Sequence, residues 1–228
     1  MGSVRKVDAW NPCECLEGEP LEGGWRVVER IQRHPLHTGG HFSVGYVVEN
    51  ERTGKSAFLK AFDFSSAFQA TDFTRRIQQL TTAYNFERDL LSACRQSSMR
   101  RVVTPLEDGE HELEVCPGPI KKVQYLIFEL AEGDIREYAS RIDDIDLAWC
   151  LRSLHHTATG IQELHSKVIV HQDIKPSNVL TFPIEGTKVS DLGRAFSPAH
   201  PMDHNSLMIP GDKSYAPPEL FYGLIDKK

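Results

Sequence analysis

The chain has 228 residues and a formal net charge of −6, and it is 40% hydrophobic and 25% charged. This composition is globular, and the length allows one large domain or two small lobes. The negative charge argues against a nucleic-acid partner or an acidic-membrane partner. The sequence shows neither a signal peptide nor an apolar run long enough to span a membrane, so we expect a cytoplasmic protein.

Runs of β-branched and aromatic residues predict strands in the first half of the chain, at 25–31, 45–50, 56–62, 101–106 and 123–130. Residues 64–79 either begin a helix or form an insertion, and 107–122 are expected to be an exposed loop. The Gly-Lys-Ser at 54–56 resembles the end of a phosphate-binding loop. However, Glu49 occupies the position of the first glycine, so a hairpin turn is the better interpretation.

A helix with one buried face is predicted around 77–94. Its apolar positions are spaced alternately by three and four residues, and Glu87 is the only charged residue among them. Glu87 either lies at the edge of this face and reaches solvent, or it faces inward and pairs with a cation, because an unpaired buried charge is costly. Lys60, near the end of a predicted strand, is the candidate cation. The predicted face consists of Ile77, Leu80, Tyr84, Glu87, Leu91 and Cys94.

The pattern becomes helical after residue 134. Residues 146–165 carry an apolar stripe of helical period, followed by short strand-like runs and a long loop at 196–211. We therefore predict an α+β fold with two lobes, one an antiparallel sheet with one helix and the other mainly helical. The predicted parts are an arm at 1–24, an N-terminal lobe at 25–128 and a C-terminal lobe at 129–228. We expect a ligand cleft between the lobes.

The cysteines suggest no disulfide framework, because there are five of them and they are widely spread. Cys13 and Cys15 are spaced like half of a zinc site, but no second pair stands at ligand spacing. A surface loop is the simpler interpretation. An interaction module built on this arm remains an alternative.

Polar residues cluster beside two short apolar runs near the end of the chain. Asp173, Lys175, Asn178 and Asp191 offer two carboxylates, an ammonium and an amide. Carboxylate and amide oxygens are hard ligands that suit Mg²⁺, and one carboxylate is instead available to accept a hydroxyl proton. The alternative is a pair of capped turns without chemistry.

These residues lie in motifs that resemble the eukaryotic-type serine/threonine protein kinases, bacterial ones included. "HQDIKPSN" (171–178) is similar to H-R-D-x-K-P-x-N, and "SDLG" (190–193) is similar to D-F-G. "AFLK" (57–60) resembles V-A-I-K, and "YAPPEL" (215–220) resembles A-P-E. The resemblance runs from about Trp25 to the end of the chain.

The resemblance implies a catalytic role for each matching residue. Asp173 would orient the substrate hydroxyl and accept its proton, and Lys175 would steady the transferred phosphate. Asn178 and Asp191 would hold Mg²⁺. Lys60 would anchor the phosphates with Glu87 as its partner. The implied reaction transfers the γ-phosphate of ATP to Ser or Thr of a protein substrate.

The resemblance also implies a nucleotide site. Phe128 would stand at its back, and the backbone of Glu129 and Ala131 would contact the adenine. The other implied residues are Gly39, Gly40 and Phe42 in the glycine-rich loop, with Ala57 and Leu180 on the two faces of the ring.

Several positions depart from the family pattern. Thr38 and Ser43 replace two glycines of the loop, and Gly45 replaces its usual valine. Gln172 replaces an arginine that usually pairs with a phosphorylated loop, which suggests that loop phosphorylation does not switch the activity. Asp212 stands where a threonine usually bonds the catalytic aspartate. A second carboxylate there needs a cation, for which Lys175 is the candidate.

The chain stops at Lys228, so the resemblance implies an incomplete lower lobe. The helix at 146–165 would then expose apolar surface, and a partner covering it is expected. Two further alternatives remain open. One is a nucleotide-binding pseudokinase or inactive fragment that acts as a scaffold. The other is a small-molecule phosphotransferase, although that class typically lacks Lys175 and the "APPE" motif.

Overall fold

A computed structural model describes residues 11–32, 43–114, 120–141, 146–202 and 209–222. The chain forms two compact units. One contains Met1–Tyr84 and Leu106–Glu129, and the other contains Asn85–Pro105 and Leu130–Lys228. None of the helices within the described ranges is both long enough and apolar enough to cross a membrane.

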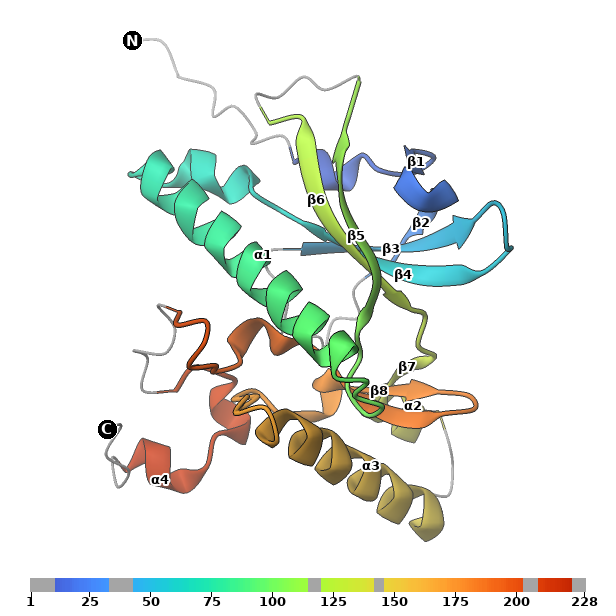
Figure 1. Cartoon of the computed structure of the whole chain (residues 1–228), viewed down its shortest axis with the longest axis vertical. Coiled ribbons are helices and arrows are strands. Elements are labelled where there is room, and N and C mark those ends of the chain that lie inside the picture. Colours follow the sequence, from blue (N-terminus) through green and yellow to red (C-terminus); the bar gives the residue numbers. More distant parts are fainter. Residues whose placement is uncertain (1–10, 33–42, 115–119, 142–145, 203–208, 223–228) are drawn as a thin grey trace. The chain divides into compact units, whose positions relative to one another are not determined.

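The first unit is built on a sheet. Within the described ranges it has the strand order β1-β2-β3-β4-β6-β5 (Figure 1). Strand β3 pairs antiparallel with β2 and β4, and β4 pairs antiparallel with β6. The strands are β1 (Pro20–Leu21), β2 (Trp25–Arg30), β3 (Ser43–Asn50), β4 (Ser56–Phe62), β5 (Pro105–Glu112) and β6 (Lys122–Glu129).

Side chains alternate between the two faces of a strand, and in β3, β4 and β6 those of one face are buried. Residues 11–24 help to cover this face. They include the 3-10 helices η1 (Pro12–Glu14) and η2 (Glu22–Gly24), and Cys13 and Leu16 have no exposed surface. The described part of the predicted arm is therefore part of the first unit. The same cluster includes Tyr46, Val48, Ala57, Leu59, Ala61 and Ile127.

Cys13 is a packing residue. Its thiol donates a hydrogen bond to the carbonyl of Phe62 at 3.1 Å. Burial, with nearby carboxylates, raises the pKa of this thiol far above its usual range, so it stays protonated. In the part of the chain that the structure describes, no group of three or more His, Cys, Asp or Glu residues could hold a metal. The Cys13 and Cys15 pair therefore has no support as a zinc site.

The strand predicted at 101–106 is shifted in the structure. The amide of Val103 donates to the carbonyl of Val189, and the amide of Val189 donates to the carbonyl of Arg101, both at 2.8 Å. These residues thus pair with a strand of the second unit. Strand β5 instead covers much of the predicted loop. It lies at a sheet edge and exposes half of its residues, with only Pro105 buried, so it lacks a buried apolar run.

Helix α1 (Phe73–Gln96) confirms the predicted helical face, because Leu80, Tyr84, Glu87 and Leu91 are all at least nine-tenths buried. Its start is set by Asp72, whose carboxylate accepts a hydrogen bond from the amide of Arg75 at 2.9 Å. The residues before it form a 3-10 helix, η3 (Ser65–Gln69). The division between the two units falls within α1, after Tyr84.

The second unit combines three strands with helices (Figure 1). Aspartates cap the N-termini of α2 and α3. Helix α3 packs against β9, where Gly160 allows the close approach, because a Cβ there would lie 2.7 Å from the carbonyl oxygen of Arg101. The helices are α2 (Ile135–Ser140), α3 (Leu147–His165) and α4 (Pro218–Phe221), and the strands are β7 (Gly133–Asp134), β8 (Val179–Phe182) and β9 (Gly186–Val189).

The apolar stripe predicted on α3 is only partly a packing face. Leu164 is fully buried, but Leu147, Leu151 and Leu154 are 70%, 58% and 67% exposed. The helix instead turns Ser153 and Gly160 inward. The expectation that this helix exposes apolar surface is thus confirmed for three leucines within the described ranges.

Candidate active site

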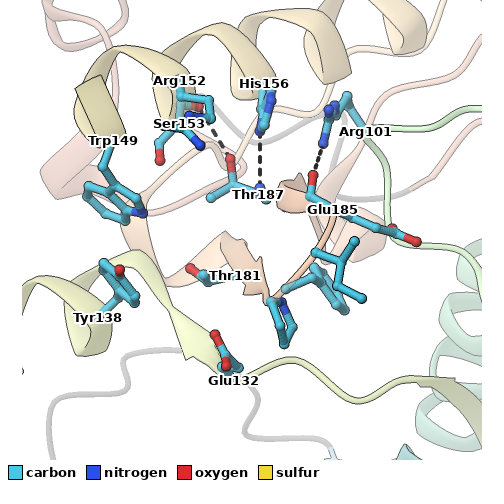
Figure 2. A pocket seen from close by; sticks show the side chains of 14 residues that line it. Arg101, Glu132, Tyr138, Trp149, Arg152, Ser153, His156, Thr181, Glu185 and Thr187 are labelled. Carbon is cyan, nitrogen blue, oxygen red and sulfur yellow. Dashed lines mark hydrogen bonds between the residues drawn. The ribbon is translucent and has the colours of Figure 1, made fainter. Parts of the chain in front are cut away.

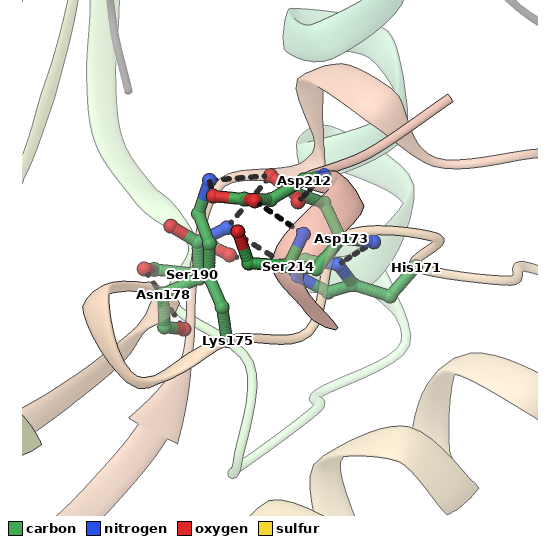
Figure 3. Close-up of polar contacts among 7 residues, drawn as sticks. All are labelled: His171, Asp173, Lys175, Asn178, Ser190, Asp212 and Ser214. Atoms are coloured by element: carbon green, nitrogen blue, oxygen red, sulfur yellow. Dashed lines mark hydrogen bonds and ion pairs between the residues drawn. The ribbon is translucent and has the colours of Figure 1, made fainter. Parts of the chain in front are cut away.

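The polar cluster of the second unit is centred on Asp173, whose side chain is only 8% exposed (Figure 3). Its Oδ1 accepts a hydrogen bond from the amide of Asp212 at 2.7 Å. Its Oδ2 lies 3.1 Å from Nζ of Lys175 and 3.2 Å from Nδ2 of Asn178. Both carboxylate oxygens are therefore held in place, and three of the predicted site residues meet at one point.

His171 holds the two halves of this cluster together. Its Nδ1 accepts a hydrogen bond from the amide of Asp173 at 3.2 Å, and its Nε2 donates to the carbonyl of Ser190 at 2.9 Å. Burial is the main influence on this ring and lowers the pKa of His171, although the bond to Ser190 and the carboxylates of Asp191 and Asp173 act in the opposite direction. The neutral ring matches this bonding pattern. His171 is not among the predicted site residues, although it begins the "HQDIKPSN" motif.

Asn178 presents one oxygen to a ligand. Its Nδ2 donates to the carbonyl oxygen and to Oδ2 of Asp173, at 2.9 and 3.2 Å. The amide nitrogen is thereby used, and Oδ1 is left as the acceptor atom. The backbone carbonyl of Asn178 accepts a bond from the amide of Ser190 at 2.8 Å, which fixes the segment just before Asp191.

Asp191 adopts a left-handed backbone conformation, with φ 62° and ψ 76°. Such a conformation is strained for a residue with a side chain and is often found at functional sites. A Cβ built on Gly193 would lie 3.3 Å from Oδ1 of Asp191 and 3.4 Å from Oε2 of Glu87. The Asp191 and Glu87 carboxylates therefore both approach Gly193 within the second unit.

The donor set of this cluster fits Mg²⁺. Asp191 is exposed and supplies a carboxylate, and Asn178 supplies an amide oxygen. Magnesium prefers such hard oxygen ligands and keeps several waters, so two protein ligands suffice. These are the two residues that the sequence predicts as magnesium ligands.

The backbone at Gly211 and Asp212 packs closely against Gln172 and Asp173. A Cβ on Gly211 would lie 2.3 Å from the carbonyl oxygen of Gln172 and 2.8 Å from Oδ1 of Asp173, so only glycine fits there. The next residue, Asp212, places its Oδ2 3.6 Å from Nζ of Lys175. Lys175 thus lies between two carboxylates, as predicted, and its side chain is only 7% exposed.

The first unit carries the predicted phosphate-anchoring lysine on the face of its sheet that is less buried. Lys60 lies opposite Gly45 of β3 in the strand register, and its Nζ is 5.2 Å from the centre of the Phe62 ring. Lys60 belongs to the first unit and Glu87 to the second. Their pairing therefore stays a prediction.

The structure corrects the assignment of Ala57. Alternation places Ala57 on the opposite face from Lys60, and Ala57 is fully buried in the core cluster. Phe58 shares the face of Lys60 instead. When "AFLK" is aligned with V-A-I-K, Phe58 and not Ala57 takes the place of the alanine, two positions before the lysine.

Gly45 and Phe58 are complementary in volume. A Cβ on Gly45 would lie 2.8 Å from Cε2 of Phe58, so the phenyl ring occupies the space of a side chain at position 45. The ring also lies near Phe128 of β6, with 6.3 Å between the ring centres. The departure from valine at position 45 therefore has a steric cause in the first unit.

We expect Gly45→Val to destabilise the protein by about 1–3 kcal/mol, because it overpacks the space beside Phe58. Phe58→Ala should relieve that clash, so the double variant should be more stable than the sum of the two single changes predicts, by roughly 0.5–3 kcal/mol. The free energy of unfolding in urea, measured for all four proteins, gives this coupling. Additive effects would show that the two positions do not share this space.

The remaining predicted nucleotide residues are distributed over both units. Phe128 and Glu129 end β6, and Glu129 lies opposite Ala57 in the register. Ala131 and Leu180 are half-buried residues of the second unit. Three others, Gly39, Gly40 and Phe42, lie outside the described residues.

A separate set of residues lines a cavity of about 440 Å³ in the second unit (Figure 2). It lies among α2, α3 and the turn between β8 and β9. The rings of Tyr138 and Trp149 stack at its side with 4.6 Å between their centres. Oγ1 of Thr181 is buried there and has no hydrogen-bond partner among the described residues. None of the predicted site residues lines this cavity.

Comparisons with known proteins agree with the motifs. Residues 38–227 match the family model described as protein kinase domain. A probable cyclin-dependent kinase 8 from Dictyostelium discoideum is 36% identical over 129 residues, which cover 49% of this chain and 32% of that protein. The inhibitor of nuclear factor kappa-B kinase subunit alpha from Danio rerio is 27% identical over 212 residues, which cover 88% of this chain and 24% of that protein.

A bacterial relative shows the same pattern. The serine/threonine-protein kinase PknA from Mycobacterium tuberculosis is 31% identical over 104 residues, covering 45% of this chain and 24% of the relative. The chain thus spans about a third or less of the length of these relatives. With a family match over most of its length, the chain belongs to the protein kinase domain family.

Proposed function

We propose that this chain transfers the γ-phosphoryl group of Mg-ATP to a serine or threonine hydroxyl of a protein substrate. The observation that carries the proposal is the buried Asp173 carboxylate, held on one oxygen by the amide of Asp212 and on the other by Lys175 and Asn178. A carboxylate fixed in this way is positioned to receive a proton from a hydroxyl placed beside it.

In this reaction the hydroxyl oxygen forms a bond to the γ-phosphorus, and the bond to the bridging oxygen of the β-phosphate breaks. Asp173 takes the hydroxyl proton, and ADP carries away the bonding electron pair. Lys175, 3.1 Å from Asp173, stabilises negative charge on the group in transit. Bound Mg²⁺, held by Asn178 and Asp191, would neutralise phosphate charge. The protein contributes mainly by positioning these groups.

On the nucleotide side, we propose that Lys60 contacts the phosphates and pairs with the buried Glu87. Phe58 replaces Ala57 as the proposed contact to one face of the adenine, because it shares the face of Lys60. Leu180 would contact the other face. The backbone of Glu129 and Ala131 would bind the adenine edge, and Gly39, Gly40 and Phe42 would cover the phosphates.

We further propose that the activity does not depend on phosphorylation of the loop that the usual arginine at position 172 would bind. We also propose that the protein acts in the cytoplasm. The support for the first point is Gln172, which lacks the positive charge that would bind a phosphate group. Gly211 and Asp212 lie against Gln172 and Asp173 through direct contacts that involve no phosphate group.

The test combines binding and catalysis on the same samples. Mg-ATP at about 100 times its dissociation constant should stabilise the folded protein by roughly 2.7 kcal/mol and raise its melting temperature by several degrees. Asp191→Ala should lose the magnesium-dependent part of this shift. A γ-phosphate transfer assay with the wild type should then show product on Ser or Thr.

Each result separates the candidate functions. A shift without phosphate transfer would favour a nucleotide-binding pseudokinase or an inactive fragment. A shift with transfer only to small molecules would favour a small-molecule phosphotransferase, which the presence of Lys175 argues against. The absence of any shift would contradict the proposed nucleotide site.

A further inference from the structure

The residue that departs most from the family pattern inside the catalytic cluster is Asp212. One of its carboxylate oxygens, Oδ1, accepts a hydrogen bond from the amide of Ser214 at 2.9 Å and caps the 3-10 helix η7 (Lys213–Tyr215). The other, Oδ2, lies 3.6 Å from Nζ of Lys175 (Figure 3). A single ammonium group therefore lies close to two carboxylates, those of Asp173 and Asp212.

Asp212 also lies beside the place where a substrate residue must sit. Its amide is 2.7 Å from Oδ1 of Asp173. A hydroxyl that gives its proton to Asp173 must come within about 2.6–3.2 Å of that carboxylate. Neighbouring residues of a peptide have Cα atoms about 3.8 Å apart, so the residue next to the phosphorylated one falls within reach of Asp212.

The side chain of Asp212 is more exposed than those of its two charged neighbours. Its side chain is 17% exposed, whereas those of Lys175 and Asp173 are 7% and 8% exposed. A positive side chain that approaches can therefore meet Asp212 before it meets the buried pair. If Asp212 pairs with that side chain, Lys175 can interact with Asp173 and the phosphoryl group without competition from Asp212.

We propose that Asp212 is a specificity residue, which selects protein substrates with Lys or Arg directly beside the serine or threonine that is phosphorylated. This inference rests on the proposed kinase function. A threonine, the usual residue at this position, would carry no charge, so the preference comes from the carboxylate. An acidic residue beside the acceptor would be disfavoured by repulsion from Asp212.

The test uses peptides that differ at one position. Each is an otherwise uncharged peptide with one serine, flanked by Ala, Lys or Glu on its N-terminal or C-terminal side. For the wild-type chain we expect kcat/KM to be roughly two to five times higher for a lysine peptide than for the alanine peptide, the range of a partly exposed ion pair. The glutamate peptides should be the poorest substrates, and added salt should weaken the lysine preference.

Asp212→Asn should remove the preference, so that the ratio of kcat/KM between the lysine and alanine peptides falls to about one, whatever its effect on the absolute rate. Asparagine retains the shape of aspartate and its capping oxygen. Asp146→Asn is the matched control, because Asp146 caps α3 with the same geometry, its carboxylate accepting from the amide of Ala148 at 2.9 Å. This control should keep the lysine preference. Asp212→Thr, the usual residue of the family, is the second variant.

The outcomes distinguish this inference from the function on which it rests. Equal kcat/KM for lysine and alanine peptides with the wild type, or an unchanged preference in Asp212→Asn and Asp212→Thr, would overturn the role of Asp212. Transfer to none of the peptides by a wild-type chain that binds Mg-ATP would overturn the proposed kinase function. Loss of all activity in both Asp212 variants, with a normal Asp146→Asn, would show that Asp212 is needed for positioning and does not set specificity.

Discussion

Asp173→Asn is expected to lower the rate of phosphoryl transfer by a factor of about 100 to 10,000, the usual contribution of a general base. Asparagine has nearly the same shape as aspartate. It keeps one side-chain oxygen that can accept the hydrogen bond from the amide of Asp212, which lies 2.7 Å from Oδ1 of Asp173 in the wild type. It cannot accept the hydroxyl proton, however. The measurement is kcat at saturating Mg-ATP and substrate, because a lost transition-state interaction lowers kcat.

The same variant should still bind nucleotide. Lys175 keeps a carboxylate neighbour in Asp212, at 3.6 Å, so the buried ammonium does not lose all its negative partners. The melting-temperature shift with Mg-ATP should therefore match that of the wild type. A fall in kcat smaller than about tenfold would mean that Asp173 is not the base. Loss of the shift together with the rate would point to damage of the fold.

The elements that could be predicted are those whose apolar residues recur at a regular spacing. Strands β2, β3, β4 and β6 and helices α1 and α3 all follow from the spacing of their apolar residues. Strand β5 was missed because an edge strand with exposed side chains lacks that spacing. The apolar stripe of α3 was predicted, but its burial was not. Periodicity indicates an apolar face and does not indicate which part of that face other residues cover.

The catalytic cluster could be predicted because its members are close in sequence. His171, Asp173, Lys175 and Asn178 fall within eight residues, and the structure joins them by direct hydrogen bonds and an ion pair. Ala57 was assigned wrongly because the "AFLK" motif was read without the alternation of the strand, which puts Phe58 beside Lys60. This error could have been avoided from the sequence.

The role of Gly211 could not be predicted from the sequence. It depends on contact between segments almost forty residues apart, as the bond between Asp212 and Asp173 shows. In the sequence, glycine at such a position looks like any turn glycine, and its close approach to Gln172 and Asp173 depends on the folded structure. The same is true of the space that Gly45 leaves for Phe58.

Gly211→Ala is expected to lower the rate of phosphoryl transfer by about 100-fold, because a misplacement of about 1 Å at a reacting group has an effect of that size. The added Cβ would lie 2.3 Å from the carbonyl oxygen of Gln172, which is a backbone atom and cannot rotate away. The segment must therefore move outward. That movement lengthens or breaks the bond from the amide of Asp212 to Asp173.

Overpacking also lowers stability, typically by about 1–3 kcal/mol, so the rate must be separated from the fold. Gly160→Ala provides the matched control. Its Cβ would lie 2.7 Å from the carbonyl oxygen of Arg101, a similar clash with backbone in the same unit, and its three nearest atoms belong to Arg101 and Val189. We expect both variants to melt at lower temperature, and only Gly211→Ala to lose most of its kcat below that temperature. Equal losses of kcat would mean that destabilisation, and not the position of Asp173, limits the reaction.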